Sequence, residues 1–381
     1  MRMLCFLVAA SIFSCPSLRA AEAALTDALQ KEAQTAIAKG LAWLAANQKP
    51  DGVWSDEKNP AMTALPLWAL AASGQAQYTS QVDKAVAFIL SKAQPDGGIY
   101  VPDPQRGGAG LGNYNTSLCM MGLHATGRKD VIRAIQKARE YTAATQLIGA
   151  DEHAGGFGYD RGGRRHTDLT NTGMALDAMR RTQSVEDLRP SGEKRADLNW
   201  DAALKYVENM QQKDGADKGG FLYTKSFAPG GNPNAGGAQR GGQGGGERAR
   251  PQLRSYGSIT YVGLLSMMHT RLTRSDPRVT SALDYCTKHW TLDENPGQGG
   301  QGIYFYYNIL TRALSAANVE AIPQAAGGSL AWREALIRKV ISLQRSDGSW
   351  INENNRWWEN DPVLVTSYSL LALEFASGMT E

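Results

Sequence analysis

Acidic, phenolic and amide side chains gather in a few short segments of the sequence, and their types suit proton transfer and ligand binding. His166, Asp168 and Asn171 lie within one such segment. Imidazole and carboxylate groups serve as general acids and bases, and an amide can hold a developing negative charge. The catalytic candidates are His166, Asp168, Asn171 and Tyr307. The wider set of ligand-binding candidates is Tyr114, Asn115, His166, Asp168, Asn171, Tyr304, Tyr307, Asn308, Trp357, Trp358 and Asp361.

Two kinds of sugar chemistry fit these residue types. A polysaccharide lyase neutralises a uronate carboxylate with Asn or Arg and removes the neighbouring proton with Tyr or His. The residues that suit these roles are Arg164, Arg165, His166, Asn171 and Tyr307. A glycoside hydrolase needs two carboxyl groups, which Glu359 and Asp361 would supply. The alternative is that the aromatic residues fill a core and the polar residues cap helices, and spacing alone does not separate these interpretations.

Asp284, Cys286 and His289 are possible zinc ligands because they lie close together in the sequence. A zinc site needs about four converging ligands. One Cys with one His three residues later is more typical of a packed or surface position. The sequence therefore predicts neither a metal site nor a cofactor.

The elements that position these residues are repeated along the chain. The pattern Trp43-Leu44-x3-Gln48-x2-Asp51-Gly52-x-Trp54 recurs in residues 206–215 and 340–350. Each copy ends a stretch with helical periodicity, and its Asp and Gly residues stop that helix and form a turn. Looser copies fall in residues 88–100, 141–157 and 285–304. The repeats predict six amphipathic helices, each followed by a turn.

A second helix follows each turn and has a register of its own. Its first position is Thr in four copies, and its seventh is Ala or Gly followed by Leu or Met. The first positions are Thr63, Thr116, Thr172, Gly257, Tyr307 and Thr366. These helices are apolar on most sides, which is typical of a helix buried on both faces.

Six amphipathic helices alternating with six buried helices predict an all-α fold, an (α/α)6 toroid of six helical hairpins in two concentric rings. It would span residues 27–377 as one domain, with the buried helices inside, because closing the ring leaves neither end of the solenoid uncapped. All turns from outer to inner helices lie at one end. The N-termini of the inner helices therefore meet at the mouth of a central cavity, where their free N–H groups favour a ligand. The candidate residues belong at this mouth, with Tyr256 beside them, and their character favours a polar ligand.

The repeat resembles the Gln/Trp repeat of squalene-hopene cyclases, on the evidence of Lys39-Gly40-x2-Trp43-Leu44-x3-Gln48-x3-Gly52-x-Trp54. The Thr-led second helix resembles the same proteins and the β-subunits of protein prenyltransferases. Residues 168–172 and 355–357 also resemble segments of exported bacterial proteins with squalene-cyclase repeats. The resemblance covers nearly the whole chain after its N-terminal segment, and it implies an architecture without implying a reaction.

The chemistry of these relatives can be tested against the sequence. Triterpene cyclases protonate their substrate with an Asp-x-Asp-Asp-Thr box at the start of an inner helix, where neighbouring carboxyls tune the acid. The matching residues are Asp168-Leu169-Thr170-Asn171-Thr172, which keep only the first Asp. We therefore expect no cyclisation, with a divergent triterpene cyclase as an alternative. The prenyltransferase zinc ligands begin inner helices, whereas Tyr285 occupies an outer-helix position.

Composition and charge exclude other classes of protein. The 381 residues are 42% hydrophobic and carry a formal charge of +3, so the chain is globular and has no basic footprint for nucleic acid. Residues 1–23 resemble a secretory signal peptide, with an apolar run too short to span a bilayer. No transmembrane segment is expected, and the sequence around Cys15 does not favour a lipid anchor. We expect an exported protein, periplasmic or secreted.

Residues 229–250 are rich in Gly and lack an apolar side chain larger than Ala, so we expect a disordered insert within the toroid. The combined prediction is an exported toroid that binds a ligand at the mouth of its central cavity. A lipid, a glycan and a protein remain open as that ligand. The alternatives are a toroidal lyase or hydrolase acting on an extracellular or periplasmic glycan, and a scaffold for protein contacts.

Overall fold

The computed structural model describes residues 25–104, 110–160, 166–225, 254–324 and 327–379. The predicted signal peptide with Cys15, the predicted insert at 229–250, and Arg164 and Arg165 lie outside these residues. The regular secondary structure of the described chain is almost entirely helical. One short hairpin, β1 (Ile322–Pro323) paired antiparallel with β2 (Ser329–Leu330), is its two-stranded sheet.

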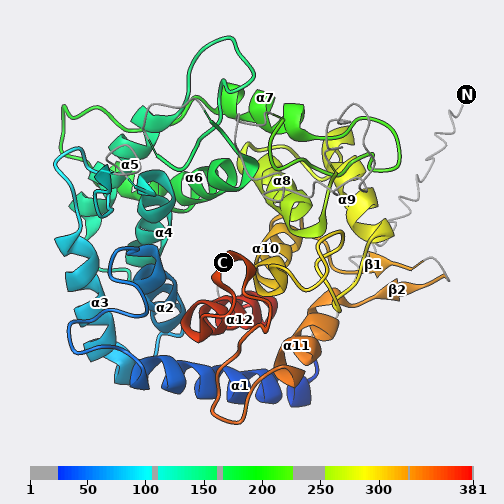
Figure 1. Ribbon diagram of the computed structural model, residues 1–381, viewed down its shortest axis with the longest axis horizontal. Helices are drawn as coiled ribbons and strands as arrows, with labels where there is room; N and C mark the ends of the chain where they lie inside the picture. The colour runs from blue at the N-terminus through cyan, green and yellow to red at the C-terminus, as the bar shows by residue number, and fades with distance from the viewer. Residues whose placement is uncertain (1–24, 105–109, 161–165, 226–253, 325–326, 380–381) are drawn as a thin grey trace, which may run out of the picture.

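Six helices form a closed inner ring (Figure 1). Each contacts the next inner helix along the chain, and the last contacts the first. The six are α2 (Ala61–Ala72), α4 (Gly112–Ala125), α6 (Leu169–Arg181), α8 (Gly257–His269), α10 (Ile303–Ala316) and α12 (Pro362–Ala376). The fold is therefore the predicted all-α toroid with its inner ring closed.

The other six α-helices of the described chain surround this ring. They are α1 (Asp27–Ala46), α3 (Thr79–Ser91), α5 (Ile132–Thr145), α7 (Trp200–Met210), α9 (Pro277–Lys288) and α11 (Trp332–Ser342). Contact between α1 and α11 closes the outer layer. Three 3₁₀ segments that lie wholly within the described residues connect helices, η1 (Ala76–Tyr78), η3 (Gln183–Leu188) and η4 (Arg356–Trp358).

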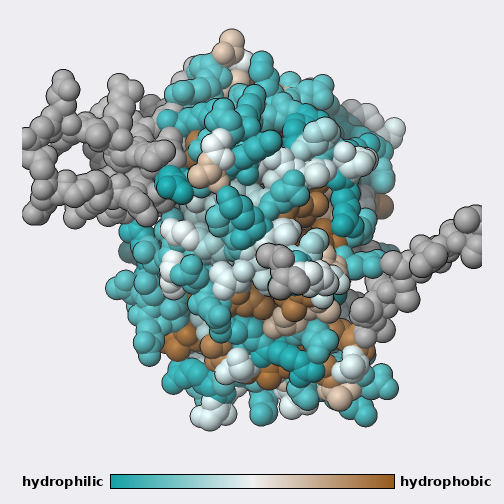
Figure 2. All heavy atoms as spheres, turned by 90° about the vertical axis from the view of Figure 1, so that its right-hand side faces the viewer, coloured by the Kyte–Doolittle hydropathy of each residue, from teal (hydrophilic) through white to brown (hydrophobic). Residues whose placement is uncertain are grey.

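Burial follows the predicted division between the two rings. Every residue of α12 after Pro362 is buried, and α8 is buried from Gly257 to Met267. The outer helices bury one face only, which in α7 consists of Ala203, Tyr206, Val207 and Met210. Figure 2 shows the side that carries α9 and α11, which is largely hydrophilic with smaller hydrophobic areas. No helix in the described part of the chain is long and apolar enough to cross a membrane.

The repeated Gln joins neighbouring outer helices. The Gln48 side-chain amide donates to the carbonyl of Gly52 in its own turn (3.1 Å) and to that of Gln81 in α3 (2.9 Å). The last copy, Gln344, donates to Gly348 (2.9 Å) and to Ala36 in α1 (2.9 Å), so it joins the two ends of the chain. Equivalent bonds run from Gln146 to Asn199 and from Gln211 to Arg278. The Gln of the repeat is therefore a structural residue.

The Thr of the inner helices holds the turn that precedes it. The Thr63 hydroxyl accepts a hydrogen bond from the backbone N–H of Trp54 (3.2 Å), and Thr366 accepts one from Trp350 (3.0 Å). In the fourth hairpin the equivalent acceptor is Thr260, which bonds the N–H of Phe221 (3.2 Å). The predicted register there, which placed Gly257 first, is three residues early. The error arose because Gly263-Leu264 lies six residues after Gly257 and has the small-then-large pattern that the register requires.

The repeat glycine lets consecutive outer helices approach. Gly155 has φ +89°, and a Cβ there would lie 1.9 Å from the carbonyl oxygen of Ala202. The corresponding glycines 52, 97, 219 and 348 also have positive φ and face a backbone carbonyl of the next outer helix. These positions therefore require Gly for both conformation and space.

We expect Gly155→Ala to destabilise the fold more than Gly127→Ala. Gly127 also has positive φ (+63°), but a Cβ added there would have no other atom within 4 Å. The control should lose about 1–2 kcal/mol from left-handed strain alone, and Gly155→Ala about 1–3 kcal/mol more from overpacking. Urea unfolding of both variants measures the difference, and equal losses would show that the approach to α7 is unimportant.

Candidate functional site

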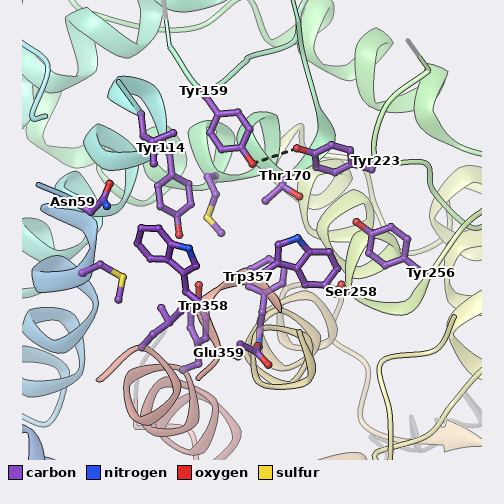
Figure 3. A pocket seen from close by; sticks show the side chains of 16 residues that line it. Asn59, Tyr114, Tyr159, Thr170, Tyr223, Tyr256, Ser258, Trp357, Trp358 and Glu359 are labelled. Carbon is purple, nitrogen blue, oxygen red and sulfur yellow. Dashed lines mark hydrogen bonds between the residues drawn. The ribbon is translucent and has the colours of Figure 1, made fainter. Parts of the chain in front are cut away.

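A cavity of about 260 Å³ opens where the N-termini of the inner helices meet. All six inner helices contribute to its wall, and the loops above them complete it (Figure 3). The lining residues are Asn59, Met62, Leu111, Tyr114, Tyr159, Thr170, Met174, Tyr223, Tyr256, Ser258, Phe305, Trp357, Trp358, Glu359, Leu364 and Tyr368. The predicted mouth is thus a cavity with a mainly aromatic wall.

Four of the five phenol hydroxyls of this wall, all but that of Tyr256, form two hydrogen-bonded pairs. Tyr114 of α4 and Tyr368 of α12 share a side-chain hydrogen bond. The hydroxyls of Tyr159 and Tyr223, which come from two loops, lie 3.4 Å apart (Figure 3). Burial raises the pKa of Tyr159 to about 12, so its hydroxyl stays protonated at neutral pH. Pairing of the hydroxyls leaves the rings as the main surface offered to a ligand.

Two consecutive tryptophans reach into the cavity from the opposite side (Figure 3). Trp357 and Trp358 are 38% and 51% exposed, and they are among the most exposed large hydrophobic residues of the described chain. Both have left-handed backbone conformations, with φ of +55° and +66°. Such a conformation is strained for a bulky residue, and strain of this kind is concentrated at ligand clamps and active sites.

We expect Trp358→Gly to be more stable than Trp358→Ala by about 1–2 kcal/mol, because Gly adopts positive φ without the strain of a Cβ atom. Both variants lose the same exposed ring, so the comparison isolates the backbone. Thermal unfolding of the two proteins provides the measurement. A more stable Ala variant would mean that the loop is relaxed at this residue.

Asp168 lies behind the cavity wall. It is fully buried as the N-cap of α6, and its carboxylate accepts hydrogen bonds from the backbone N–H (2.8 Å) and side-chain amide (2.7 Å) of Asn171. Burial raises the pKa of Asp168, and the bonds from Asn171 and from Tyr223 partly offset that effect. A ligand in the cavity would meet the Tyr223 ring before the carboxyl group.

Glu359 is the carboxyl-bearing residue of the described cavity wall. Its Oε1 accepts from the backbone N–H of Phe305 (2.8 Å) at the start of α10, and its Oε2 accepts from the Asn352 amide (2.7 Å). Burial raises the pKa of Glu359, and these donors act against the rise. Because both of these partners are donors, the geometry suits a carboxylate that anchors the loop to the helix N-terminus.

Two other predicted site residues cap helices. Asn115 is buried, and its side-chain oxygen accepts from the N–H of Ala61 at the start of α2 (3.0 Å). Asp361 is the N-cap of α12 and accepts from the N–H of Val363 (2.8 Å). It also binds the Ser55 hydroxyl. Asp361 does not line the cavity, so the geometry does not bring it together with Glu359 as a pair facing one ligand.

The predicted residues of α10 do not line the cavity. The Tyr307 hydroxyl donates to the carbonyl of Leu292 (2.6 Å), and burial raises its pKa, which is the reverse of what a catalytic base needs. Tyr304 packs against Tyr307 with ring centroids 5.8 Å apart. Asn308 is buried beside Arg312. His166 is partly exposed and, like these three, is absent from the wall.

The cavity therefore joins a different set of residues from the predicted one. Of the predicted ligand-binding residues, Tyr114, Trp357 and Trp358 line it. Sequence reasoning misses Tyr159 and Tyr223, since both lie in loops outside the repeat register. The sequence favours a polar site, yet aromatic and aliphatic side chains dominate the wall. Among the described residues, no group of three His, Cys, Asp or Glu side chains could hold a metal ion.

Fold and cavity together define an α/α toroid with a central aromatic cavity, and solved structures share the toroid fold. Type II terpene cyclase MstE from Scytonema matches with a TM-score of 0.55 at 13% identity, covering 92% of this chain and 99% of that chain. The GH76A α-1,6-mannanase from Salegentibacter sp. HEL1_6 matches with a TM-score of 0.55 at 11% identity, covering 93% and 100%. At these identities the likeness shows the fold alone. No family profile and no curated protein matches the sequence.

Proposed function

We propose that this toroid binds an elongated apolar molecule of isoprenoid type in its aromatic cavity. The observation that carries the proposal is the composition of the wall, in which ring faces and the side chains of Met62, Met174 and Leu364 outnumber free polar groups. Burying such a molecule against this wall is favourable because apolar surface leaves water. A glycan would instead require many unpaired donors and acceptors, and four of the five phenols here already bond to one another.

Two structural neighbours support this choice, one because it was solved with an isoprenoid molecule and the other because its mutated residues have no counterpart in this chain. A variant of MstE was solved with geranylgeranyl dihydroxybenzoate, and it matches this chain with a TM-score of 0.54 at 12% identity over 92% of this chain and 99% of that chain. An inactive variant of the mannanase was solved with α-1,6-mannotetrose and carries Ala in place of two consecutive aspartates. This chain contains no consecutive aspartates, which favours the apolar ligand over mannan cleavage.

We expect the protein to release the bound molecule without changing it chemically. Protonating an alkene requires a strong acid that faces the cavity, and Asp168 lies behind Tyr223 with its oxygens bonded to Asn171. Incubation with squalene and with shorter polyprenyl diphosphates, followed by gas chromatography of the extract, should yield no cyclic product above a boiled control. Any such product would show that the protein is a cyclase.

Tryptophan fluorescence can measure binding directly, because Trp357 and Trp358 line the cavity. Titration with geranylgeraniol should change the emission and saturate, whereas mannotetraose should leave it unchanged. Thr170→Phe fills the cavity and should weaken binding by about tenfold or more, the size of effect expected when a few apolar contacts are blocked. The matched control Thr35→Phe, on the exposed face of α1, should bind normally. Saturable binding of mannotetraose without geranylgeraniol binding would reject the proposal.

We further propose that the protein acts outside the cytoplasm, as the resemblance of residues 1–23 to a signal peptide suggests. N-terminal sequencing of the protein from its own host should give a chain that begins after Ala20 or Ala23. An intact Met1 in a cytoplasmic fraction would contradict export.

A further inference from the structure

A second cavity, of about 620 Å³, opens at the opposite rim, where the inner helices end. All six inner helices contribute to it as well. Its wall combines aromatic and aliphatic residues with basic ones: Trp68, Ala72, Met121, His124, Ala125, Arg181, Leu265, His269, Arg312, Ser315, Ala316 and Phe375. A void of about 10 Å³ beside Thr170, Met174, Asp177 and Arg312 lies between the two cavities, and no described residue lines both of them.

Two guanidinium groups and one carboxylate meet at the inner end of this cavity. Asp177 is buried and receives a hydrogen bond from Arg181 Nε (2.9 Å), while Arg312 pairs with its other oxygen. His269 Nε2 lies 3.0 Å from the same carboxylate. Burial and the nearby guanidinium groups lower the pKa of His269 to about 3, so the imidazole is neutral. Two guanidinium groups therefore face one carboxylate.

The Arg312 side chain has an N–H group without a hydrogen-bond partner among the described residues. The side chain is 2% exposed, and this group is its Nε–H. Its Nη1 reaches Asn308 only at 3.4 Å. Burial lowers the pKa of Arg312 to about 10, which still leaves it charged at neutral pH. A buried guanidinium with a free N–H is costly unless an acceptor binds there.

The carbonyl groups at the C-termini of the inner helices are not the partners of the Arg312 guanidinium. Helix ends carry partial negative charge and free carbonyls that attract cations, but other side chains already bind these carbonyls. Arg180 binds His269 O (2.9 Å), Arg139 binds Met179 O (2.6 Å) and Thr126 binds Leu123 O (2.6 Å). Arg312 pairs with Asp177, and its Nε–H remains for another acceptor.

The rest of the wall suits an apolar body. Trp68 and Phe375 pack edge to face with centroids 6.1 Å apart. The Arg181 guanidinium lies over both rings, 5.3 and 4.9 Å from their centroids, and that of Arg312 lies 5.2 Å from Trp68. A molecule whose acidic group meets the guanidiniums would rest its apolar part on these rings and on Leu265.

We infer that this second cavity binds a carboxylate with an apolar body, its oxyanion held by Arg312 and Arg181 and its apolar part against Trp68 and Phe375. The site is independent of the cavity at the other rim. A free oxyanion such as sulfate shares the headgroup chemistry and should bind more weakly, because it makes no contact with the rings.

The test compares decanoate with decanol, which has the same chain without the charge, and with sulfate, by isothermal titration calorimetry of the full chain. Decanoate should bind about tenfold or more tightly than decanol, and Arg312→Gln should remove about that factor, as expected for the loss of a charged hydrogen bond. Arg338→Gln, an exposed change of equal charge on α11, should leave the affinity unaltered. Equal affinity for decanoate and decanol, or full decanoate binding to Arg312→Gln, would overturn the inference.

A second variant keeps the inference testable if the first variant does not fold. If Arg312→Gln does not fold, Arg181→Gln still removes a guanidinium from the wall while Asp177 keeps its partners Arg312 and His269. It should weaken decanoate binding and leave geranylgeraniol binding at the other rim unchanged. Parallel loss of both ligands would contradict two separate sites, and sulfate binding as tight as decanoate binding would contradict the role of Trp68 and Phe375.

Discussion

Replacing Arg139 by Met is expected to lower the free energy of unfolding by about 3–5 kcal/mol, the range for breaking one side of a buried ion pair. Arg139 is 1% exposed, and its Nε donates to Glu186 (2.8 Å). Its other nitrogens bind the carbonyls of Met179 (2.6 Å) and Ala196 (3.0 Å). One side chain thus ties α5 to the end of α6 and to the connection that leads to α7. Met would remove these donors from the Met179 and Ala196 carbonyls and one of the two guanidinium partners of Glu186, which would keep Arg189.

The matched control is Arg133→Met on the same helix. Arg133 pairs with Glu193, but the two side chains are 49% and 37% exposed, so the loss should be about 0–1 kcal/mol. Urea unfolding at neutral pH measures both variants. Similar losses for Arg139→Met and Arg133→Met would mean that the buried network contributes no more than a surface pair.

Glu374→Met is expected to stabilise the protein increasingly as pH rises. Glu374 is fully buried in α12, and neither carboxyl oxygen has a hydrogen-bond partner among the described residues. Burial raises its pKa well above the ordinary value. The folded state therefore holds a proton that the unfolded state releases above about pH 4.3. Stability of the natural chain falls with pH in that window, by about 1.4 kcal/mol for each pH unit.

Unfolding free energies between pH 4 and pH 8 provide the measurement. The difference between Glu374→Met and the natural chain should be small at pH 4 and should grow toward pH 8. The exposed substitution Glu320→Met removes the same group from the surface and should give a difference that stays near zero. A pH-independent difference for Glu374→Met would show that the carboxyl group has an unrecognised partner.

The fold could be predicted because the repeated residues are the ones that hold the helices together. Gln48 and Gln344 join outer helices, Gly155 allows their close approach, and Thr63 and Thr366 hold the turns. The Gln role recurs in four hairpins and the Gly and Thr roles in five, so their signatures recur in the sequence. The fourth register failed by three residues because a small-then-large pair occurs at more than one place in α8.

The site was harder to predict because helix N-termini attract polar residues for two different reasons. Asn115 and Asp361 are at the predicted rim, but their side chains satisfy backbone N–H groups of α2 and α12. Tyr159 and Tyr223 enter the wall from loops, whose course does not follow the helical period. Trp357 and Trp358 were predicted at the mouth and do line the cavity, but their left-handed conformation leaves no signal in residue type.

The position of a bound isoprenoid tests the central claim most directly. A geranylgeraniol analogue with a photoreactive diazirine would be irradiated with the full-length protein, and the labelled peptides would be mapped by mass spectrometry with excess geranylgeraniol as competitor. We predict competable labels in the segments that contain Tyr114, Tyr223 and Trp357, around the aromatic cavity. Labels confined to Arg181 and Phe375 at the other rim, or labels that the competitor does not reduce, would contradict the claim.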